Sequence, residues 1–463
     1  MKTAPKVILA IIFLTSASLA QEKRSPKAFS TPDVIALHHV SVVDVEGGRL
    51  KRDQTVIVSN DQISAVGSSK NVPIPAGAVI IDGKGKYLVP GFADMHVHLY
   101  TEGDVLTYLA NGVTTVRNMA GDATHLDFKR RVASGEMIGP RIRTAGPVIE
   151  TGSLSHPDNV LLTDPASAWR EIERQSKAGY DFIKVYNEMS PDVYAAVIAA
   201  AKKFNMPVVG HVPFEVGLEN ALKAPQRSIE HLRGYQREML APTDPVRTST
   251  SFRDRSVAWN LVDASLMNGL AERTAAAGVW NCPTLVFSVH EMSPAAEHAR
   301  LLKRPEAEFL SLQGLPDRTK KEGYLRDFTD RDFAATQRGL TSQFRLLRQL
   351  DVAGAGILVG TDSWLAGYAY VDELELLVRA GFTPARVLRM ATMDAARFFG
   401  EAARWGTIEI GRRADLVLLD GNPLQNIANA RQMRAVISNG RLLHRGDLDA
   451  LIKKLPRSKI PGN

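Results

Sequence analysis

The sequence has little cysteine, no long apolar run and no basic stripe. Cys282 is the only cysteine among 463 residues, so an internal disulfide is excluded. The apolar run at residues 7–14 is too short to cross a bilayer, and we expect no stable membrane association. Part of the net charge of +7 lies near the two chain ends, and the rest is mixed along the chain without interleaved aromatic residues. We therefore expect no nucleic-acid partner.

The start of the chain has the pattern of a secretory signal peptide. Lys2 and Lys6 precede the short apolar run, and small residues end at Ala20, before Gln21. We expect residues 1–20 to be a signal peptide that is cleaved near Ala20, which makes the protein exported, either periplasmic or secreted. No cysteine follows this position to hold a lipid, and an uncut N-terminal anchor is the alternative.

The two ends of the remaining chain share a β-rich pattern. Alternating apolar residues occupy residues 30–89 and return at residues 405–446, as in GTIEIGRRADLVLLD. Gly47-Gly48 and Asn60-Asp61 are turn signals between the short strands. We expect both segments to pair as one small composite β-sandwich domain.

Between these ends, at residues 90–404, short apolar strands alternate with helical stretches such as residues 191–204 and 372–380. The segments that we interpret as strands are FADMHVHL, TTVRNM, RIRTAG, FIKVY, PVVGHV, SIEHL, VWNCPTL and GILVGTD. A charged segment at residues 291–348 is longer than a simple crossover between two strands. We expect it to form a helical excursion between the seventh and eighth strands. The predicted fold is α/β: a (β/α)8 TIM barrel with a small β-sandwich built from both chain ends.

Two histidines, His96 and His98, stand two residues apart at the end of the first of these strands. Successive side chains of a strand alternate between faces, so both imidazoles project together and can bind one divalent metal. Asp94 shares their face and is predicted to orient a ligand. Barrel enzymes hold their chemistry at the C-terminal ends of the strands. The candidate metal ligands at those ends are His96, His98, Lys184, His211, His231 and Asp362.

Each candidate also has a plain structural interpretation. Taken singly, His211 and His231 fit core positions, and Asp362 fits a helix cap. Lys184 is the least ordinary, because a lysine inside an apolar strand buries a charge at a large cost. Burial lowers the pKa of an amine, and a neutral amine can react with carbon dioxide. The resulting carbamate on Lys184 would be an anionic ligand that can bridge two metals.

Six motifs follow one another in the order PGFADMHVHL, FIKVY, GHV, SIEHL, GTDS and GTIEIGRRADLVLLD. Together they resemble the metal-dependent amidohydrolase superfamily over residues 33–445. Within it, SIEHLRGY and AGYAYVDELELLVRAGFTPARVLRMAT are similar to the prolidase-like, imidazolonepropionase-like dipeptidase branch. The resemblance implies two divalent ions bridged by carboxylated Lys184, with His96, His98 and Asp362 on one ion and His211 and His231 on the other. Nitrogen and oxygen donors without a thiolate favour Zn²⁺.

The expected activity follows from this ligand set. A water shared by two ions is available as hydroxide near neutral pH, so we expect a binuclear hydrolase in which a metal-bridging hydroxide attacks an amide carbonyl. Asp362 is the expected catalytic residue, which takes a proton and passes it to the leaving nitrogen. The resemblance implies a small-molecule substrate, a dipeptide or an N-acyl amino acid, cleaved as by a dipeptidase or carboxypeptidase.

Three alternatives stay open. A cyclic amide hydrolase of the hydantoinase or dihydropyrimidinase type also uses the bridging lysine. An imidazolonepropionase-like enzyme is similar to mononuclear members that lack this lysine. A binding protein that has kept the metal site but lost catalysis is the third alternative.

Two residues outside the ligand set are predicted to bind substrate. Where relatives have a Gly-Gly-His-Gly type loop after the third strand, this chain reads ETGSLSHP at residues 150–157. His156 in this loop is a candidate for binding a substrate carboxylate, with an ordinary surface histidine as the alternative. Tyr235, just beyond the sixth strand, is a second candidate.

Overall fold

The structure is a computed structural model, which describes residues 33–309 and 325–457. The predicted signal peptide, residues 1–20, lies outside the described residues. Within the two described ranges, no helix has both the length and the apolar character that crossing a membrane requires.

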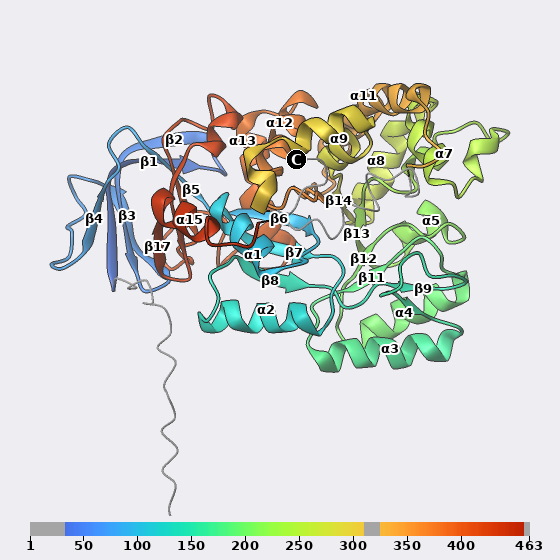
Figure 1. The fold of residues 1–463 in the computed structure, drawn as a ribbon, viewed down its shortest axis with the longest axis horizontal. Coiled ribbons are helices and arrows are strands. Elements are labelled where there is room, and N and C mark those ends of the chain that lie inside the picture. The colour runs from blue at the N-terminus through green and yellow to red at the C-terminus, as the bar shows by residue number, and fades with distance from the viewer. Residues whose placement is uncertain (1–32, 310–324, 458–463) are drawn as a thin grey trace, which may run out of the picture. The chain divides into compact units, whose positions relative to one another are not determined.

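The two ends of the described chain meet in one sheet of eight strands. In spatial order these are β17 (Arg441–His444), β16 (Met433–Ser438), β15 (Leu416–Leu419), β5 (Tyr87–Pro90), β1 (Val34–Asp44), β2 (Arg49–Ser59) and β3 (Gln62–Ser68), with β4 (Val79–Asp82) also paired to β1. Strand β15 pairs antiparallel with β5, with Val417 opposite Val89. Figure 1 shows the blue strands from the start of the chain and the red strands from its end in this sheet.

This sheet has a hydrophobic cluster of its own. Residues from both ends of the chain share it, among them Ile35 and Val56 from the first segment and Leu416 and Ile437 from the second. Each of these side chains is almost fully buried. The alternating apolar pattern of both segments is therefore explained by one shared core, since alternate residues of a strand face the same side.

Parallel strands form two further sheets. The first holds β6 (Phe92–Val97), β7 (Val113–Asn118) and β8 (Arg141–Thr144). The second holds β10 (Val160–Leu161), β9 (Ile149–Glu150), β11 (Ile183–Val185), β12 (Val208–Gly210), β13 (Gln226–Glu230) and β14 (Trp280–Cys282). All six residues of β6 are buried, as expected of a parallel strand covered on both faces.

Backbone contacts link these two sheets at both of their edges. A parallel bridge joins Ala145, just after β8, to Phe182, just before β11. On the other side, Asn281 of β14 bridges to Ile357. Residues 356–362 then return to β6, where the amide of Met95 donates to the carbonyl of Val359 and the amide of Asp362 donates to the carbonyl of His96, both at 2.8 Å. Backbone contacts thus run from β6 through β14 and residues 356–362 back to β6, and we call this series of strands the ring.

Helices connect successive strands of this ring. They are α1 (Glu102–Ala110), α2 (Ala123–Ser134), α3 (Pro165–Ala178), α4 (Pro191–Lys203), α5 (Gly217–Lys223), α6 (Tyr235–Glu238), α7 (Phe252–Val257) and α8 (Met267–Ala276). Helices α3 and α4 pack together and share a core with β11 and β12. Figure 1 shows α2, α3 and α4 along the outer side of the strands.

The predicted excursion between the seventh and eighth strands is helical in its described part. It contains α9 (Ala295–Leu302) and the 24-residue α11 (Asp330–Ala353). After residues 356–362 follow α12 (Tyr370–Arg379), α13 (Pro384–Arg389) and α14 (Ala395–Phe398), and the chain closes with α15 (Arg445–Ile452). The two helices predicted at residues 191–204 and 372–380 correspond to α4 and α12.

Candidate metal centre

The six predicted ligands stand at the ends of strands in the ring. His96 lies in β6 and His98 just after it, Lys184 lies in β11, and His211 and His231 directly follow β12 and β13. Asp362 ends the segment that returns to β6. Because all these strands are parallel, their C-terminal ends meet on one side, where a common site can form.

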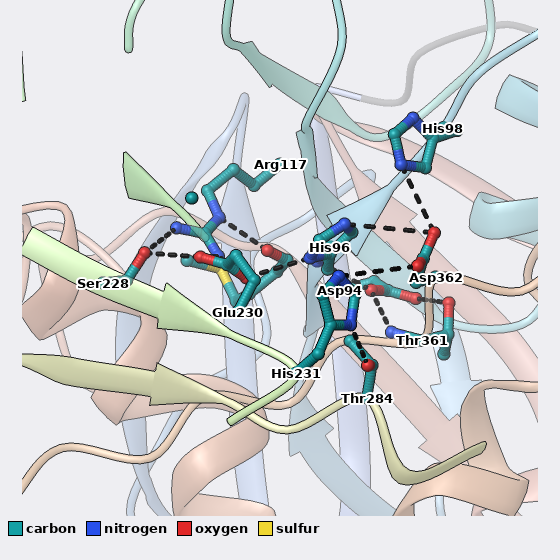
Figure 2. A network of polar contacts seen from close by, with 12 residues as sticks. Asp94, His96, His98, Arg117, Ser228, Glu230, His231, Thr284, Thr361 and Asp362 are labelled. Carbon is teal, nitrogen blue, oxygen red and sulfur yellow. Dashed lines mark hydrogen bonds and ion pairs between the residues drawn. The ribbon is translucent and has the colours of Figure 1, made fainter. Parts of the chain in front are cut away.

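The carboxylate of Asp362 is the point on which three imidazoles converge. Its oxygens lie 3.3 Å from Nε2 of His98, 3.7 Å from Nε2 of His231 and 3.9 Å from Nε2 of His96. Ligand atoms of His96, His231 and Asp362 all fall within 4.8 Å of one another. Figure 2 shows the three rings turned toward this carboxylate. Such separations are short enough for these side chains to belong to one metal centre, since the bonds of a divalent ion to nitrogen and oxygen are about 2.0–2.2 Å long.

Hydrogen bonds to the second ring nitrogen fix the orientation of three of these histidines. Nδ1 of His96 lies 2.9 Å from a carboxylate oxygen of Glu230, and Nδ1 of His231 lies 2.6 Å from the hydroxyl of Thr284. Nδ1 of His211 lies 2.8 Å from the amide oxygen of Asn187. A donor hydrogen on Nδ1 leaves Nε2 as the metal-binding nitrogen, which is the arrangement that metal sites use. The residues present therefore fit a metal centre.

The protonation of these imidazoles also suits metal binding. Burial lowers the pKa of His96 to about 4 and holds the pKa of His211 and His231 well below its ordinary value. Only a neutral imidazole has a lone pair for a metal ion. At neutral pH these rings are therefore ready to bind without losing a proton.

Lys184 is buried on β11, with 2% of its surface exposed. Burial lowers the pKa of its amine to about 8, although the negative charges of Glu230 and Asp362 oppose this shift. Gly210 on the neighbouring β12 leaves room for the lysine stem, since a Cβ there would lie 3.1 Å from Cδ of Lys184. The electrostatic coupling to Asp362 indicates that the amine belongs to the same polar cluster.

A buried ion pair supports His96 from behind. Arg117 on β7 and Glu230 on β13 are both fully buried, and Nη2 of Arg117 lies 2.9 Å from both carboxylate oxygens of Glu230. Arg117 also donates to the carbonyl of Met95 and to the hydroxyl of Ser228. Burial alone would raise the pKa of Glu230, but Arg117 and the hydrogen bond with His96 hold it below its usual range. Figure 2 shows this chain of contacts from Arg117 through Glu230 to His96.

Asp94 joins β6 to the loop that bears Asp362. Its carboxylate accepts hydrogen bonds from the backbone amide and the hydroxyl of Thr361, and from the backbone amide of His96. Asp94 therefore fixes the backbone beside two predicted ligands, as expected of a residue that orients them.

Several residues of the candidate metal centre have a strained backbone conformation. Nine non-glycine residues in the described ranges have a positive φ, a conformation that costs most side chains energy. Those at this centre are His231 (φ 57°), Leu232 (φ 52°), Thr284 (φ 48°) and Asp362 (φ 46°). Strained residues persist where the surrounding structure holds them, and they cluster at functional sites.

The packing around Gly360 makes a first prediction possible. A Cβ at this position would lie 2.4 Å from Sγ of Cys282 and 2.8 Å from the backbone nitrogen of His96. We expect Gly360→Ala to displace His96 and to weaken metal binding by about 10- to 100-fold, the usual effect of disturbing a ligand's support. Metal retained after dialysis against a graded chelator measures this change. Gly446→Ala, where a Cβ meets nothing within 4 Å, is the matched control and should bind metal as the unmodified protein does.

The two predicted substrate-binding residues lie differently from the ligands. Tyr235 is fully buried, and its hydroxyl lies 2.9 Å from Asn281 and 3.0 Å from Thr274. The turn at Gly234 and the start of α6 direct this ring into the core, and the role of Tyr235 in substrate binding stays a prediction. The side chain of His156 is 58% exposed in the loop after β9, beside Asp158. Its role stays a prediction.

Comparison with known proteins identifies the family. The model of the amidohydrolase family matches residues 87–443. An ochratoxinase from Aspergillus niger is 22% identical over 488 residues, covering 91% of this chain and 88% of that protein. The solved bottromycin amidohydrolase has a TM-score of 0.71 at 24% identity, over 91% of this chain and 89% of the other. A Xaa-Pro dipeptidase with bound methionine in its active site gives 0.67 at 21% identity, over 89% and 100%.

At these identities the solved structures establish a shared fold, and the family match spans most of the chain. The predicted superfamily is thereby confirmed, and prolidase-like dipeptidases are among the structural neighbours. The chain belongs to the amidohydrolase family.

Proposed function

We propose that this hydrolase cleaves amide bonds of dipeptides or N-acyl amino acids at a centre of two divalent metal ions. The convergence of three imidazoles on Asp362, next to a buried lysine with a lowered pKa, is the observation that supports this most directly. The proposed ligands of one ion are His96, His98 and Asp362, and those of the other are His211 and His231, with carboxylated Lys184 between them. Zn²⁺ is the ion that this donor set favours.

The residues of the proposed centre have separate roles in the reaction. Bound ions would supply an activated water and polarise the amide carbonyl. The carboxylate of Asp362 faces the ring nitrogens of three histidines and is placed to hold a proton and deliver it to the leaving nitrogen. His98, with 27% of its side chain exposed, is the most open of these ligands and marks the side from which substrate enters.

The fold that we propose for this activity is a closed (β/α)8 barrel with a β-sandwich from both chain ends. The parallel backbone contacts from β6 round to residues 356–362 support the barrel. The joint sheet of β1–β5 and β15–β17, with its own hydrophobic cluster, supports the second domain.

Metal content and substrate turnover together test the proposed function. We expect two divalent ions per chain by elemental analysis, and hydrolysis of a panel of dipeptides and N-acyl amino acids. Chelation should abolish turnover without unfolding, because the hydrophobic cores are made by apolar side chains. Turnover of hydantoins, dihydropyrimidines or imidazolonepropionate alone would instead support one of the alternative activities.

A pair of histidine variants controls this experiment. His98→Ala should lose metal and turnover, whereas His39→Ala should keep both, since His39 is an exposed residue of β1 beside Asp53. One ion or none per chain after expression with ample metal would contradict the binuclear centre.

A further inference from the structure

Three arginines lie together beyond His231, which directly follows β13. Arg233 follows β13, Arg237 lies in α6 and Arg255 lies in α7. All three line one cavity of about 390 Å³, together with Val212 and Phe214. We call Arg233, Arg237 and Arg255 the arginine cluster.

Two carboxylates, those of Glu215 and Glu238, also line the cavity. Glu238, Glu188 and Asp362 act on the arginine cluster only from beyond ion-pair distance. Within residues 33–309 and 325–457, no carboxylate oxygen lies within ion-pair distance of these guanidinium groups, although their neighbours Arg247 and Arg253 have Glu238 and Asp332 as partners. Like charges that are buried without a partner are costly, because each loses its hydration and repels the others. Such a group of positive charges is stabilised when an anion binds beside it.

Several donors of the cluster are also buried and unused. Nε of Arg233, Nε of Arg237 and Nη1 of Arg255 are buried without a hydrogen-bond partner. Arg255 is only 6% exposed, and its single hydrogen bond goes from Nε to the carbonyl of Ser251. Buried donors in proteins are almost always paired, and the three side chains that carry these unpaired donors all line the cavity, which points to a ligand there.

Aromatic rings hold the guanidinium groups in place. The guanidinium carbon of Arg255 lies 4.8 Å from the centre of the Phe214 ring, and that of Arg237 lies 5.1 Å from the same ring. The guanidinium carbon of Arg233 lies 5.4 Å from the ring of Phe252. Stacking leaves the edge of a guanidinium group free, and this edge binds a carboxylate through two parallel hydrogen bonds.

The arginine cluster adjoins the metal centre. Arg233 lies two residues after His231, and Val212, which directly follows His211, lines the same cavity as the arginine cluster. Tyr186, which stacks on His211 with ring centres 4.3 Å apart, interacts with both Arg233 and Arg255. An anion at the cluster is therefore near a substrate bound at the centre.

We propose that the arginine cluster binds the carboxylate of the substrate, with Arg255 and Arg233 as the principal donors. This inference rests on the proposed function, because it assigns the carboxylate-bearing amino acid of a dipeptide or N-acyl amino acid to this cavity. Val212, Phe214 and Leu218 give the cavity an apolar wall for the side chain of that amino acid. The enzyme then selects free C-terminal acids over their neutral amides.

Calorimetric binding to the metal-loaded full chain tests the assignment without requiring turnover. The probes are 3-phenylpropionate and the neutral 3-phenyl-1-propanol, which differ in the carboxylate and cannot be hydrolysed. We expect the acid to bind at least about 10-fold more tightly, and Arg255→Gln to lower its affinity by about 10- to 100-fold while that of the alcohol is unchanged. Arg253→Gln, on the same helix but paired with Asp332, should behave as the unmodified protein does.

Thermal unfolding separates a binding role from a structural one. Arg255→Gln removes a buried charge without a partner, so its melting temperature should rise in the absence of ligand while acid binding falls. A lower melting temperature together with unchanged acid binding would overturn the proposal. Arg233→Gln provides the same comparison if Arg255→Gln does not fold.

Two further outcomes distinguish this proposal from others. Inorganic phosphate that displaces 3-phenylpropionate at equal or lower concentration would overturn the carboxylate assignment in favour of a phosphorylated ligand. If N-acyl amino acids and their amides are hydrolysed equally well, and Arg255→Gln changes neither, the arginine cluster is refuted while the amide hydrolase stands. If acid binding depends on Arg255 but no amide is hydrolysed, the proposed activity fails and the carboxylate site stands.

Discussion

Lys184→Arg is expected to lose both bound metal and activity, with kcat/KM falling by about 10⁴-fold or more. A guanidinium group stays charged at every working pH and cannot form a carbamate, so it would place a cation where a bridging anion is needed. The buried position of Lys184 makes this substitution decisive, because solvent cannot screen the added charge. Elemental analysis and turnover of the same preparation measure both losses.

Lys184→Ala extends this experiment. Short carboxylic acids should partly restore metal and activity by supplying the missing bridge.

The unmodified lysine can be tested by labelling. Burial lowers the pKa of the Lys184 amine to about 8, so the neutral amine becomes the main form above this pH. Uptake of carbon-13-labelled bicarbonate by the metal-free protein should therefore rise as the pH passes through about 8. Lys202→Arg, an exposed substitution on α4, is the control. Near-normal activity of Lys184→Arg would mean that the lysine is structural and that the centre is built without it.

Arg117→Met is expected to lower the free energy of unfolding by about 3–5 kcal/mol, because it leaves the charge of Glu230 buried without its partner. It should also weaken metal binding, since Glu230 orients the ring of His96. Denaturant unfolding of the metal-free and metal-loaded protein separates the two effects.

The double variant Arg117→Met with Glu230→Gln tests whether the unpaired charge of Glu230 causes this loss of stability. Removing both charges should recover much of the lost stability, because no unpaired ion then remains in the core. Arg130→Met is the matched control, since Arg130 forms its ion pairs on the surface with 58% of its side chain exposed, and such pairs contribute about 0–1 kcal/mol. A loss below about 1 kcal/mol in Arg117→Met would contradict the importance that we assign to the buried pair.

The parallel strands could be predicted because a strand that is buried on both faces consists of a short run of apolar residues. Strands such as FIKVY and PVVGHV are short apolar runs, and the structure has β11 and β12 within them. The segment GILVGTD pairs with its neighbours through a single bridge and a few backbone hydrogen bonds, and it is not a regular strand. The segment bends at its end, where Asp362 has a positive φ. No local pattern of residue types specifies this conformation.

The residues around the ligands were harder to predict. The reasoning that singled out Lys184, a charge inside an apolar strand, applies equally to Arg117 in TTVRNM and Glu230 in SIEHL. Their partnership could not be predicted, because the two residues lie 113 positions apart and meet only through the order of strands in the ring. Tyr235 shows the opposite case, in which closeness in sequence to His231 does not determine the direction of a side chain after a tight turn.

The position of β15 between β5 and β16 imposes an order on assembly of the nascent chain. Strand β5 is complete at residue 90, but the strand that pairs with its open edge begins at Leu416. At a synthesis rate of about 5–20 residues per second, roughly 15–65 s separate the two on the ribosome. Throughout that interval the edge of β5 can pair with other unfinished chains. A chain that stops before Leu416 keeps this edge exposed for good.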